Sequence, residues 1–446
     1  MKTFAVALIV GLLAAGITQP ACAHVPPGEK GIVVDGKVNC PYVPSSGGTI
    51  FLHLSITTPK FDVPKRKPLN LSIVLDRSGS MGDSRKIEYA KAALTTLVRQ
   101  LTRDDILSIV IYDDVVEILV PARKVRDKRE ILHLVDEVYA RGWTNLGGGM
   151  IEGFNQVEKN ASRKYINRVI LLSDGLANQG ITEPRQLNTI ARRYRSRSIS
   201  LTTMGVGLDF NENLMVGLAE HGGGSYYFIE SPHSIAHILH REFDALSTVL
   251  AQNAVLEIDL GRKAHLKDVI GHEWKEENGR YQVSLGDLYA DNTSSLTLEL
   301  DVKEGSGNIT LAAGSLQYET DKTFLQDRPS FRTAVEYTSD ATVVEQNRDM
   351  EVQARADIAV STRKVEQAME ALDAGKTEEA ARELDDAQRF LQASPAATAA
   401  GAGEFIREQK VRLESFEKIL KDSSNDTRRA KKSIQYDNYR IQKNKN

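Results

Sequence analysis

Residues 69–81 read LNLSIVLDRSGSM, and this stretch decides the fold. Its first seven residues form a short apolar run, which is typical of a strand buried on both faces of a parallel sheet. The run ends directly at Asp76, which is followed by Ser78 and Ser80 on a tight turn. In open α/β sheets, ligands bind beyond the carboxyl ends of the strands. The stretch therefore predicts an α/β domain with oxygen-bearing side chains at the edge of its sheet.

Strand-like runs and helical periodicity continue to alternate as far as residue 250. We expect strands at 106–112, 115–120, 166–172, 199–204 and 225–229, and helices at 86–101, 128–139, 148–160, 183–195, 211–221 and 231–250. Repeated β-α units of this kind indicate a mainly parallel sheet with helices on both faces. The predicted fold class is therefore α/β, doubly wound.

Two further residues place oxygen atoms at the same edge of the sheet. Thr144 opens a glycine-rich loop at a different strand-to-helix crossing, and Asp174 follows the strand at 166–172. Carboxylate and hydroxyl oxygens are the ligands that hard cations such as Mg²⁺ prefer. The structural alternative is a serine-rich turn, a threonine at a helix N-cap and a capping aspartate. Because these three segments all lie at the same edge of the predicted sheet, we interpret them as one metal site. Its ligands are Asp76, Ser78, Ser80, Thr144 and Asp174.

This residue set resembles the metal-ion-dependent adhesion site of the von Willebrand factor A (VWA) domain family, over about residues 69–250. The resemblance implies a Rossmann-like fold and a bound Mg²⁺, with Mn²⁺ or Ca²⁺ as alternatives. It also implies that Ser78, Ser80 and, in the ligand-bound form, Thr144 coordinate the cation directly. Asp76 and Asp174 would act largely through bound water. With few direct carboxylate contacts, the cation stays electrophilic, and an acidic side chain of a protein partner can complete its shell.

The regions that flank this domain have different patterns. Residues 24–68 form a lead-in with one strand at 49–57, and residues 251–340 alternate with period two, as in an antiparallel β-sandwich. We hypothesise that the strand at 49–57 pairs into this sandwich, so that the α/β domain is an insertion. Residues 341–421 are predicted to be helical, and residues 422–446 a basic, disordered tail. The whole layout is similar to exported bacterial proteins related to inter-α-trypsin-inhibitor heavy chains and calcium-activated chloride channel regulators.

The N-terminus predicts export. Lys2, an apolar run and Ala21-Cys22-Ala23 form a signal peptide, residues 1–23, so the mature chain is expected to be periplasmic or secreted. The alternatives are an uncleaved anchor, for which the run is short, and a lipoprotein modified on Cys22 in a poor sequence context. No later segment reads as a membrane span. Cleavage leaves Cys40 alone, so no internal disulfide framework is expected.

The favoured function is a metal-dependent protein-binding module for adhesion or scaffolding, and the chain is not expected to be an enzyme. A metal-assisted hydrolase is one alternative, but it needs a base or nucleophile beside the metal, and Glu88 and Asp113 are the nearest candidates. The other alternative is a scaffold whose C-terminal helices assemble an envelope complex while the metal site is purely structural. The balance of 57 basic and 60 acidic residues argues against a nucleic-acid partner. The sequence names neither the partner nor the oligomeric state.

Overall fold

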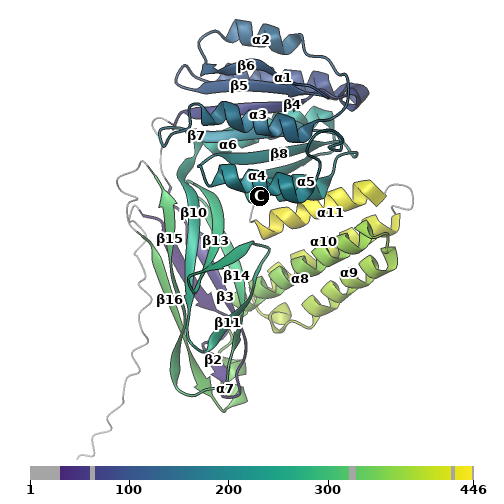
Figure 1. The fold of residues 1–446 in the computed structure, drawn as a ribbon. Coiled ribbons are helices and arrows are strands. Elements are labelled where there is room, and N and C mark those ends of the chain that lie inside the picture. Colours follow the sequence, from purple (N-terminus) through teal and green to yellow (C-terminus); the bar gives the residue numbers. More distant parts are fainter. Residues whose placement is uncertain (1–30, 61–65, 321–327, 423–426, 444–446) are drawn as a thin grey trace, which may run out of the picture.

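Three parts make up the molecule (Figure 1): an α/β domain, a β-sandwich below it and a group of helices beside the sandwich. The computed structural model describes residues 31–60, 66–320, 328–422 and 427–443 of the 446-residue chain. The predicted signal peptide and Cys22 lie outside these ranges. Cys40 is a buried free thiol whose Sγ donates to the carbonyl oxygen of Val344 at 3.3 Å. Within the described ranges, no helix is long and apolar enough to cross a membrane.

The α/β domain is built on a six-stranded sheet in the order β6-β5-β4-β7-β8-β9. Its strands are β4 (Leu69–Asp76), β5 (Ile106–Tyr112), β6 (Val116–Lys124), β7 (Ile166–Ser173), β8 (Ser200–Val206) and β9 (Gly223–Ile229). All neighbouring strands are parallel except β5 and β6, which are antiparallel. Every residue of β4, β5, β7 and β8 is buried. This burial on both faces explains why these strands are rich in apolar residues and show no regular alternation with exposed polar ones.

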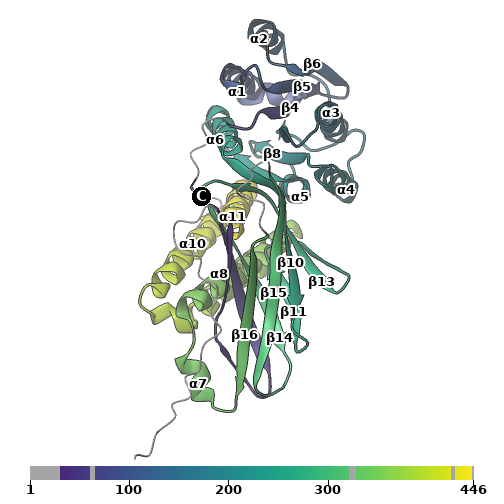
Figure 2. The same ribbon diagram turned by 90° about the vertical axis from the view of Figure 1, so that its left-hand side faces the viewer.

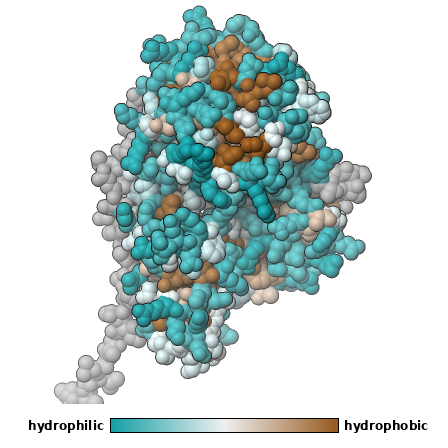
Figure 3. Space-filling view, in the orientation of Figure 1, coloured by the Kyte–Doolittle hydropathy of each residue, from teal (hydrophilic) through white to brown (hydrophobic). Residues whose placement is uncertain are grey.

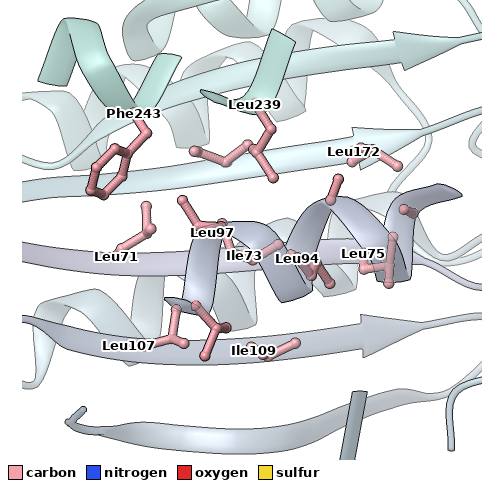
Figure 4. Packing of buried hydrophobic residues seen from close by; sticks show 14 of the residues in the cluster. Leu71, Ile73, Leu75, Leu94, Leu97, Leu107, Ile109, Leu172, Leu239 and Phe243 are labelled. Carbon is pink, nitrogen blue, oxygen red and sulfur yellow. The ribbon is translucent and has the colours of Figure 1, made fainter. Parts of the chain in front are cut away.

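Helices cover both faces of this sheet. They are α1 (Lys86–Gln100), α2 (Lys128–Asp136), α3 (Leu146–Glu158), α4 (Pro184–Arg195), α5 (Glu212–Gly222) and α6 (Ile235–Ser247), with short 3₁₀ helices η1 (Gly79–Arg85) and η2 (Pro232–Ser234). One core packs α1, α2 and α6 on one face, and a second core packs α3, α4 and α5 on the other. Figure 4 shows Leu94 and Leu97 of α1 together with Leu239 and Phe243 of α6 over the strands. The predicted doubly wound α/β fold is confirmed.

Two antiparallel sheets form the sandwich. The first contains β1 (Val33–Val38), β3 (Gly48–Thr57), β14 (Thr293–Val302) and β11 (Ala264–Ile270), in that order. The second contains β12 (Trp274–Glu277), β13 (Arg280–Tyr289), β10 (Val249–Leu260), β15 (Asn308–Glu319), β16 (Ser330–Thr338) and β2 (Tyr42–Pro44), with only the short β2 parallel to its neighbour. Along β3, buried apolar residues alternate with more exposed ones, as in a strand with one face in a core.

Strand β3 confirms the hypothesis of an inserted domain. It pairs with β14 over its whole length, from Gly48 opposite Val302 to Thr57 opposite Thr293. The sandwich core therefore takes residues from both sides of the α/β domain in the sequence. The two domains are also joined by a buried ion pair, in which Arg168 Nη2 of β7 lies 2.5 Å from Asp287 Oδ2 of β13. This ion pair connects β7 of the α/β sheet directly to β13 of the sandwich.

The C-terminal region is helical, as predicted for 341–421. It contains α7 (Ala341–Gln346), α8 (Met350–Asp373), α9 (Thr377–Gln392), the 3₁₀ helix η4 (Pro395–Thr398) and α10 (Ala402–Asp422). Helices α8, α9 and α10 share a core, and α8 also packs against β3, β11 and β14 of the sandwich. Figures 1 and 2 both place this helical group beside the sandwich.

The prediction of a disordered tail at 422–446 is wrong for the described part of that range, because Thr427–Gln442 form a further helix, α11. Figure 1 shows α11 beneath the α/β domain, between it and α10. Lys431 Nζ lies 2.6 Å from Glu212 Oε1, and the buried Lys432 pairs with the same carboxylate. Tyr439 packs edge-on against Tyr226, with ring centroids 5.7 Å apart. The basic residues are ordered because the α/β domain supplies their counter-charge.

Stability should depend on pH through His53. This half-buried residue lies on β3, and burial together with the charge of Arg355 lowers its pKa from 6.5 to about 4. Below pH 6.5, His53 is protonated in the unfolded chain but stays neutral in the folded chain. The stability that is present above that pH is therefore lost as the pH falls toward 4. We expect the free energy of unfolding to fall by up to about 1.4 kcal/mol per pH unit from this group. The free energy of unfolding, measured with urea at several pH values in this range, should change less steeply with pH in His53→Gln than in the natural chain. The exposed control His133→Gln should keep the pH dependence of the natural chain. An unchanged slope in His53→Gln would contradict the prediction.

Candidate metal centre

The five predicted ligands gather at the carboxyl edge of the α/β sheet. Asp76 ends β4, and Asp174 directly follows β7, which is the neighbouring strand. The chain leaves β4 toward β5 on one side and returns to β7 on the other, so the strand order reverses between β4 and β7. Such a reversal opens the crevice in which α/β sheets bind ligands. Asp76, Ser78, Thr144 and Asp174 are all buried there, and Ser80 is half-buried.

Hydrogen bonds link four of the five residues into one chain across two loops. Asp76 Oδ1 accepts from the backbone N–H of Ser78 at 2.8 Å, and the hydroxyls of Ser78 and Ser80 lie 3.2 Å apart. Ser80 Oγ then donates to Asp174 Oδ1 at 2.8 Å. The structure therefore brings together the aspartates and serines that the sequence predicted, although their role as metal ligands stays a prediction.

Thr144 completes the set from a third loop, just before α3. A side-chain carbon placed on Gly175 would lie 3.2 Å from Thr144 Oγ1 and 3.7 Å from Ser80 Oγ. The loop after Asp174 thus passes close to both hydroxyls, and a larger residue at 175 would crowd Thr144 Oγ1. The backbone N–H of Thr144 donates to Asn178 Oδ1 at 2.9 Å, which ties the Thr144 loop to the loop after β7.

Asp76 is held by residues that the sequence analysis did not single out. Its Oδ2 accepts hydrogen bonds from Ser173 Oγ at 2.6 Å and from the Tyr112 hydroxyl at 3.3 Å. Burial raises the pKa of Asp76 to about 6, although the hydrogen bonds from Ser173 and Ser78 act in the opposite direction. Desolvation thus opposes the charged form of this carboxylate, and a nearby cation would favour it. The donor set, two carboxylates and three hydroxyls, fits a hard divalent cation.

Lys86 is a further residue that the sequence analysis missed. Its Nζ lies 2.6 Å from Asp174 Oδ2, and both side chains are buried. Lys86 begins α1, directly after Ser84 and Arg85, which have left-handed φ values of 51° and 58°. A lysine in the first turn of a helix opposes the helix dipole, which favours acidic residues there. That unfavourable placement was the available signal that the lysine is held by a negative partner.

Neither hydrolase candidate is placed as a free base. Glu88 is half exposed and lies 3.7 Å from Lys91 on the same helix. Asp113 is buried and pairs with Arg77 Nε at 2.9 Å and Arg141 Nε at 2.8 Å. Burial would raise the pKa of Asp113, but hydrogen bonding from Arg141 and the charge of Arg77 keep it below its ordinary value. Both residues therefore have structural partners that account for them.

Across the described residues, no group of three or more His, Cys, Asp and Glu side chains is placed to hold a metal ion. The predicted centre differs in composition from such groups, because only two of its five residues, Asp76 and Asp174, are carboxylates. A site of this kind is recognised by its hydroxyl groups and by the loops that carry them.

Residues 70–241 match the von Willebrand factor type A domain family. An uncharacterized protein of Synechocystis is 28% identical over 260 residues, covering 56% of this chain and 61% of that protein. YfbK of Escherichia coli is 29% identical over 247 residues, covering 54% of this chain and 43% of that protein. Human inter-alpha-trypsin inhibitor heavy chain H3 is 25% identical over 259 residues, covering 53% of this chain and 29% of that protein. The match thus spans less than two thirds of each of these relatives.

Two solved structures resemble nearly the whole chain. The von Willebrand factor type A protein from Catenulispora acidiphila has a TM-score of 0.70 at 14% identity, covering 94% of this chain and 98% of that chain. The ArnB paralog VWA2 from Sulfolobus acidocaldarius has a TM-score of 0.62 at 18% identity, covering 92% and 99%. The likeness therefore concerns the fold, and it includes the sandwich and C-terminal helices as well as the α/β domain.

Proposed function

Because residues 70–241 form a von Willebrand factor type A domain, we propose that this chain is an exported module that binds a protein partner through a divalent cation at residues 76, 78, 80, 144 and 174. Mg²⁺ is the cation that the hydroxyl-rich donor set suits best, since Mg²⁺ keeps several waters and few protein contacts. The N-terminal sequence supports export, and the two residues considered for the hydrolase, Glu88 and Asp113, both have structural partners.

The hydrogen-bonded chain from Asp76 through Ser78 and Ser80 to Asp174 carries this proposal. In it, the hydroxyls of Ser78 and Ser80 would hold the cation directly, and Thr144 would join them when a partner is bound. Asp76 and Asp174 are already engaged by donors, so they would act mainly by orienting water and balancing charge. A cation held in this way keeps a coordination position for a carboxylate of the partner.

Isothermal titration calorimetry and affinity capture test the proposal together. We expect the mature protein to bind Mg²⁺, and Asp174→Ala to lose at least tenfold in Mg²⁺ affinity, because ligand orientation typically changes metal affinity by about 10–100-fold. The matched control is Asp136→Ala, which removes an exposed carboxylate of α2 and should bind Mg²⁺ normally. Partners captured from an envelope extract should require Mg²⁺ and should be lost with chelator and with Asp174→Ala.

The scaffold alternative predicts a different pattern. If the metal site is only structural, Asp76→Ala should lower the melting temperature while the same partners are still captured. If Asp76→Ala loses the partners but keeps the melting temperature, the scaffold interpretation is wrong. If partners are still captured in the presence of chelator and by both variants, we would assign partner binding to the sandwich or to α8–α10 instead.

A further inference from the structure

Exposed hydrophobic side chains gather around the candidate metal centre. Among the described residues, nine large hydrophobic side chains are exposed, and four of these are in loops at the carboxyl edge of the α/β sheet. They are Val115, Tyr139, Trp143 and Leu176, with exposures of 55%, 60%, 63% and 54%. Figure 3 shows a mainly hydrophilic face of the molecule, whose larger hydrophobic patches lie over the α/β domain. Exposed tryptophan beside a polar site is typical of a protein-binding surface.

The loops that carry these residues are fixed to the metal centre. Trp143 directly precedes Thr144, and the carbonyl oxygen of Gly142 accepts from the N–H of Gly79 at 3.1 Å, inside the Ser78–Ser80 turn. The carbonyl oxygen of Thr144 accepts from the N–H of Asn178 at 3.1 Å, so Leu176 lies in a loop bound to the same segment. Trp143 and Leu176 therefore flank the centre from two loops, and little conformational entropy is lost when a partner packs on them.

The loops around the candidate metal centre, here called the rim, carry exposed charged residues of both signs in equal number. Asp83 and Asp114 are exposed, and so are Arg85 and Arg141. Asp114 belongs to the rim because its Oδ1 accepts from the N–H of Trp143 at 3.4 Å. Because the two signs balance, these charges neither attract nor repel a charged segment as a whole. The distinguishing feature of the rim is therefore its exposed apolar surface, which favours apolar side chains next to the acidic residue that reaches the cation.

We infer that the partner segment presents one aspartate or glutamate flanked by an aromatic or branched aliphatic side chain, which packs on Trp143 and Leu176. This inference rests on the proposed function and specifies its partner. The carboxylate completes the cation's shell, and the apolar neighbour buries the exposed faces of Trp143 and Leu176. Apolar burial adds affinity that a lone carboxylate cannot supply.

Trp143 itself can report on this contact, because the chain has only two tryptophans. In a Trp274→Phe background, Trp143 is the single tryptophan of the full-length mature chain. The probe is a synthetic peptide library in which a central aspartate is fixed and three positions on either side vary, offered with Mg²⁺. We expect enrichment of aromatic and branched aliphatic neighbours, and a blue shift of Trp143 emission when an enriched peptide binds.

Trp143→Ala, in the protein that keeps Trp274, should weaken an enriched peptide at least tenfold, with Mg²⁺ affinity unchanged. The matched control is Trp274→Phe alone, which changes an exposed aromatic residue of the sandwich and should leave peptide affinity unchanged. Enrichment without apolar neighbours, no enrichment over a library with asparagine at the centre, or full affinity in Trp143→Ala would overturn the inference. If Mg²⁺ binding itself is absent by calorimetry, the proposed function fails. If Mg²⁺ binds and aspartate is required but its neighbours do not matter, only the inference fails.

Discussion

Lys86→Met should bind Mg²⁺ about ten to a hundred times more tightly than the natural chain, and should be less stable without the cation. The ammonium group of Lys86 lies 2.6 Å from Asp174 Oδ2, inside the candidate centre. A positive charge repels a divalent cation bound nearby, and a ten- to hundredfold change in affinity corresponds to about 1.4–2.8 kcal/mol of such repulsion. Removing Lys86 relieves this repulsion, so the affinity for Mg²⁺ rises.

The same substitution leaves Asp174 buried without a cation, which typically destabilises a protein by about 3–5 kcal/mol. Saturating Mg²⁺ should therefore raise the melting temperature of Lys86→Met by more than that of the natural chain. Calorimetric titration and thermal unfolding with and without Mg²⁺ measure both effects.

Lys91→Met is the matched control, because Lys91 is on the same helix but pairs with Glu88 and Asp136. It should keep natural Mg²⁺ affinity. Weaker Mg²⁺ binding in Lys86→Met would contradict the electrostatic argument, and would show that Lys86 mainly holds Asp174 in position.

Asp287→Ala should lower the free energy of unfolding by about 3–5 kcal/mol, because it leaves the guanidinium of Arg168 buried and unpaired. Arg168 is fully buried in β7, where Nη1 also lies 3.3 Å from Thr202 Oγ1 and the charge of Glu242 acts on the guanidinium less strongly than that of Asp287. A neutral hydroxyl cannot replace the carboxylate as a counter-charge. Urea unfolding at neutral pH measures the loss.

The double variant Arg168→Met with Asp287→Leu is the control for this prediction. Replacing both members of a buried ion pair by apolar residues of similar size is often close to neutral. We expect the double variant to be more stable than Asp287→Ala alone. If it is as unstable as the single variant, the loss comes from packing at this contact and the argument from an unpaired charge is wrong.

The α/β fold and the residues at its edge could be predicted because their signals are local. Residues 69–75 are mainly apolar, and the strand they form is buried on both faces. The order of buried strands and helices then predicts that Asp76 and Asp174 lie at the same edge of the sheet, and the structure adds that their strands, β4 and β7, are neighbours. The strand at 49–57 could also be predicted, because its apolar and polar residues alternate. Such alternation indicates a strand with one buried face, which must pack against another sheet.

Three features depended on distant contacts and could not be predicted in the same way. α11 has few buried apolar residues, such as Ile434 and Tyr439, among many basic ones, so its composition resembles a solvated tail. Its order depends on Glu212 and Tyr226, which are more than 200 residues away in the sequence. The pairs Lys86–Asp174 and Arg168–Asp287 likewise join residues whose proximity only the folded chain creates.

The junction between the α/β domain and the sandwich contains almost no slack. α6 ends at Ser247 and β10 begins at Val249, so one residue separates them. β10 is the shared strand between β13 and β15, with antiparallel hydrogen bonds on both sides. β10 cannot shift without disturbing its hydrogen bonds to β13 and β15, so this short connection restricts how far the α/β domain can move relative to the sandwich.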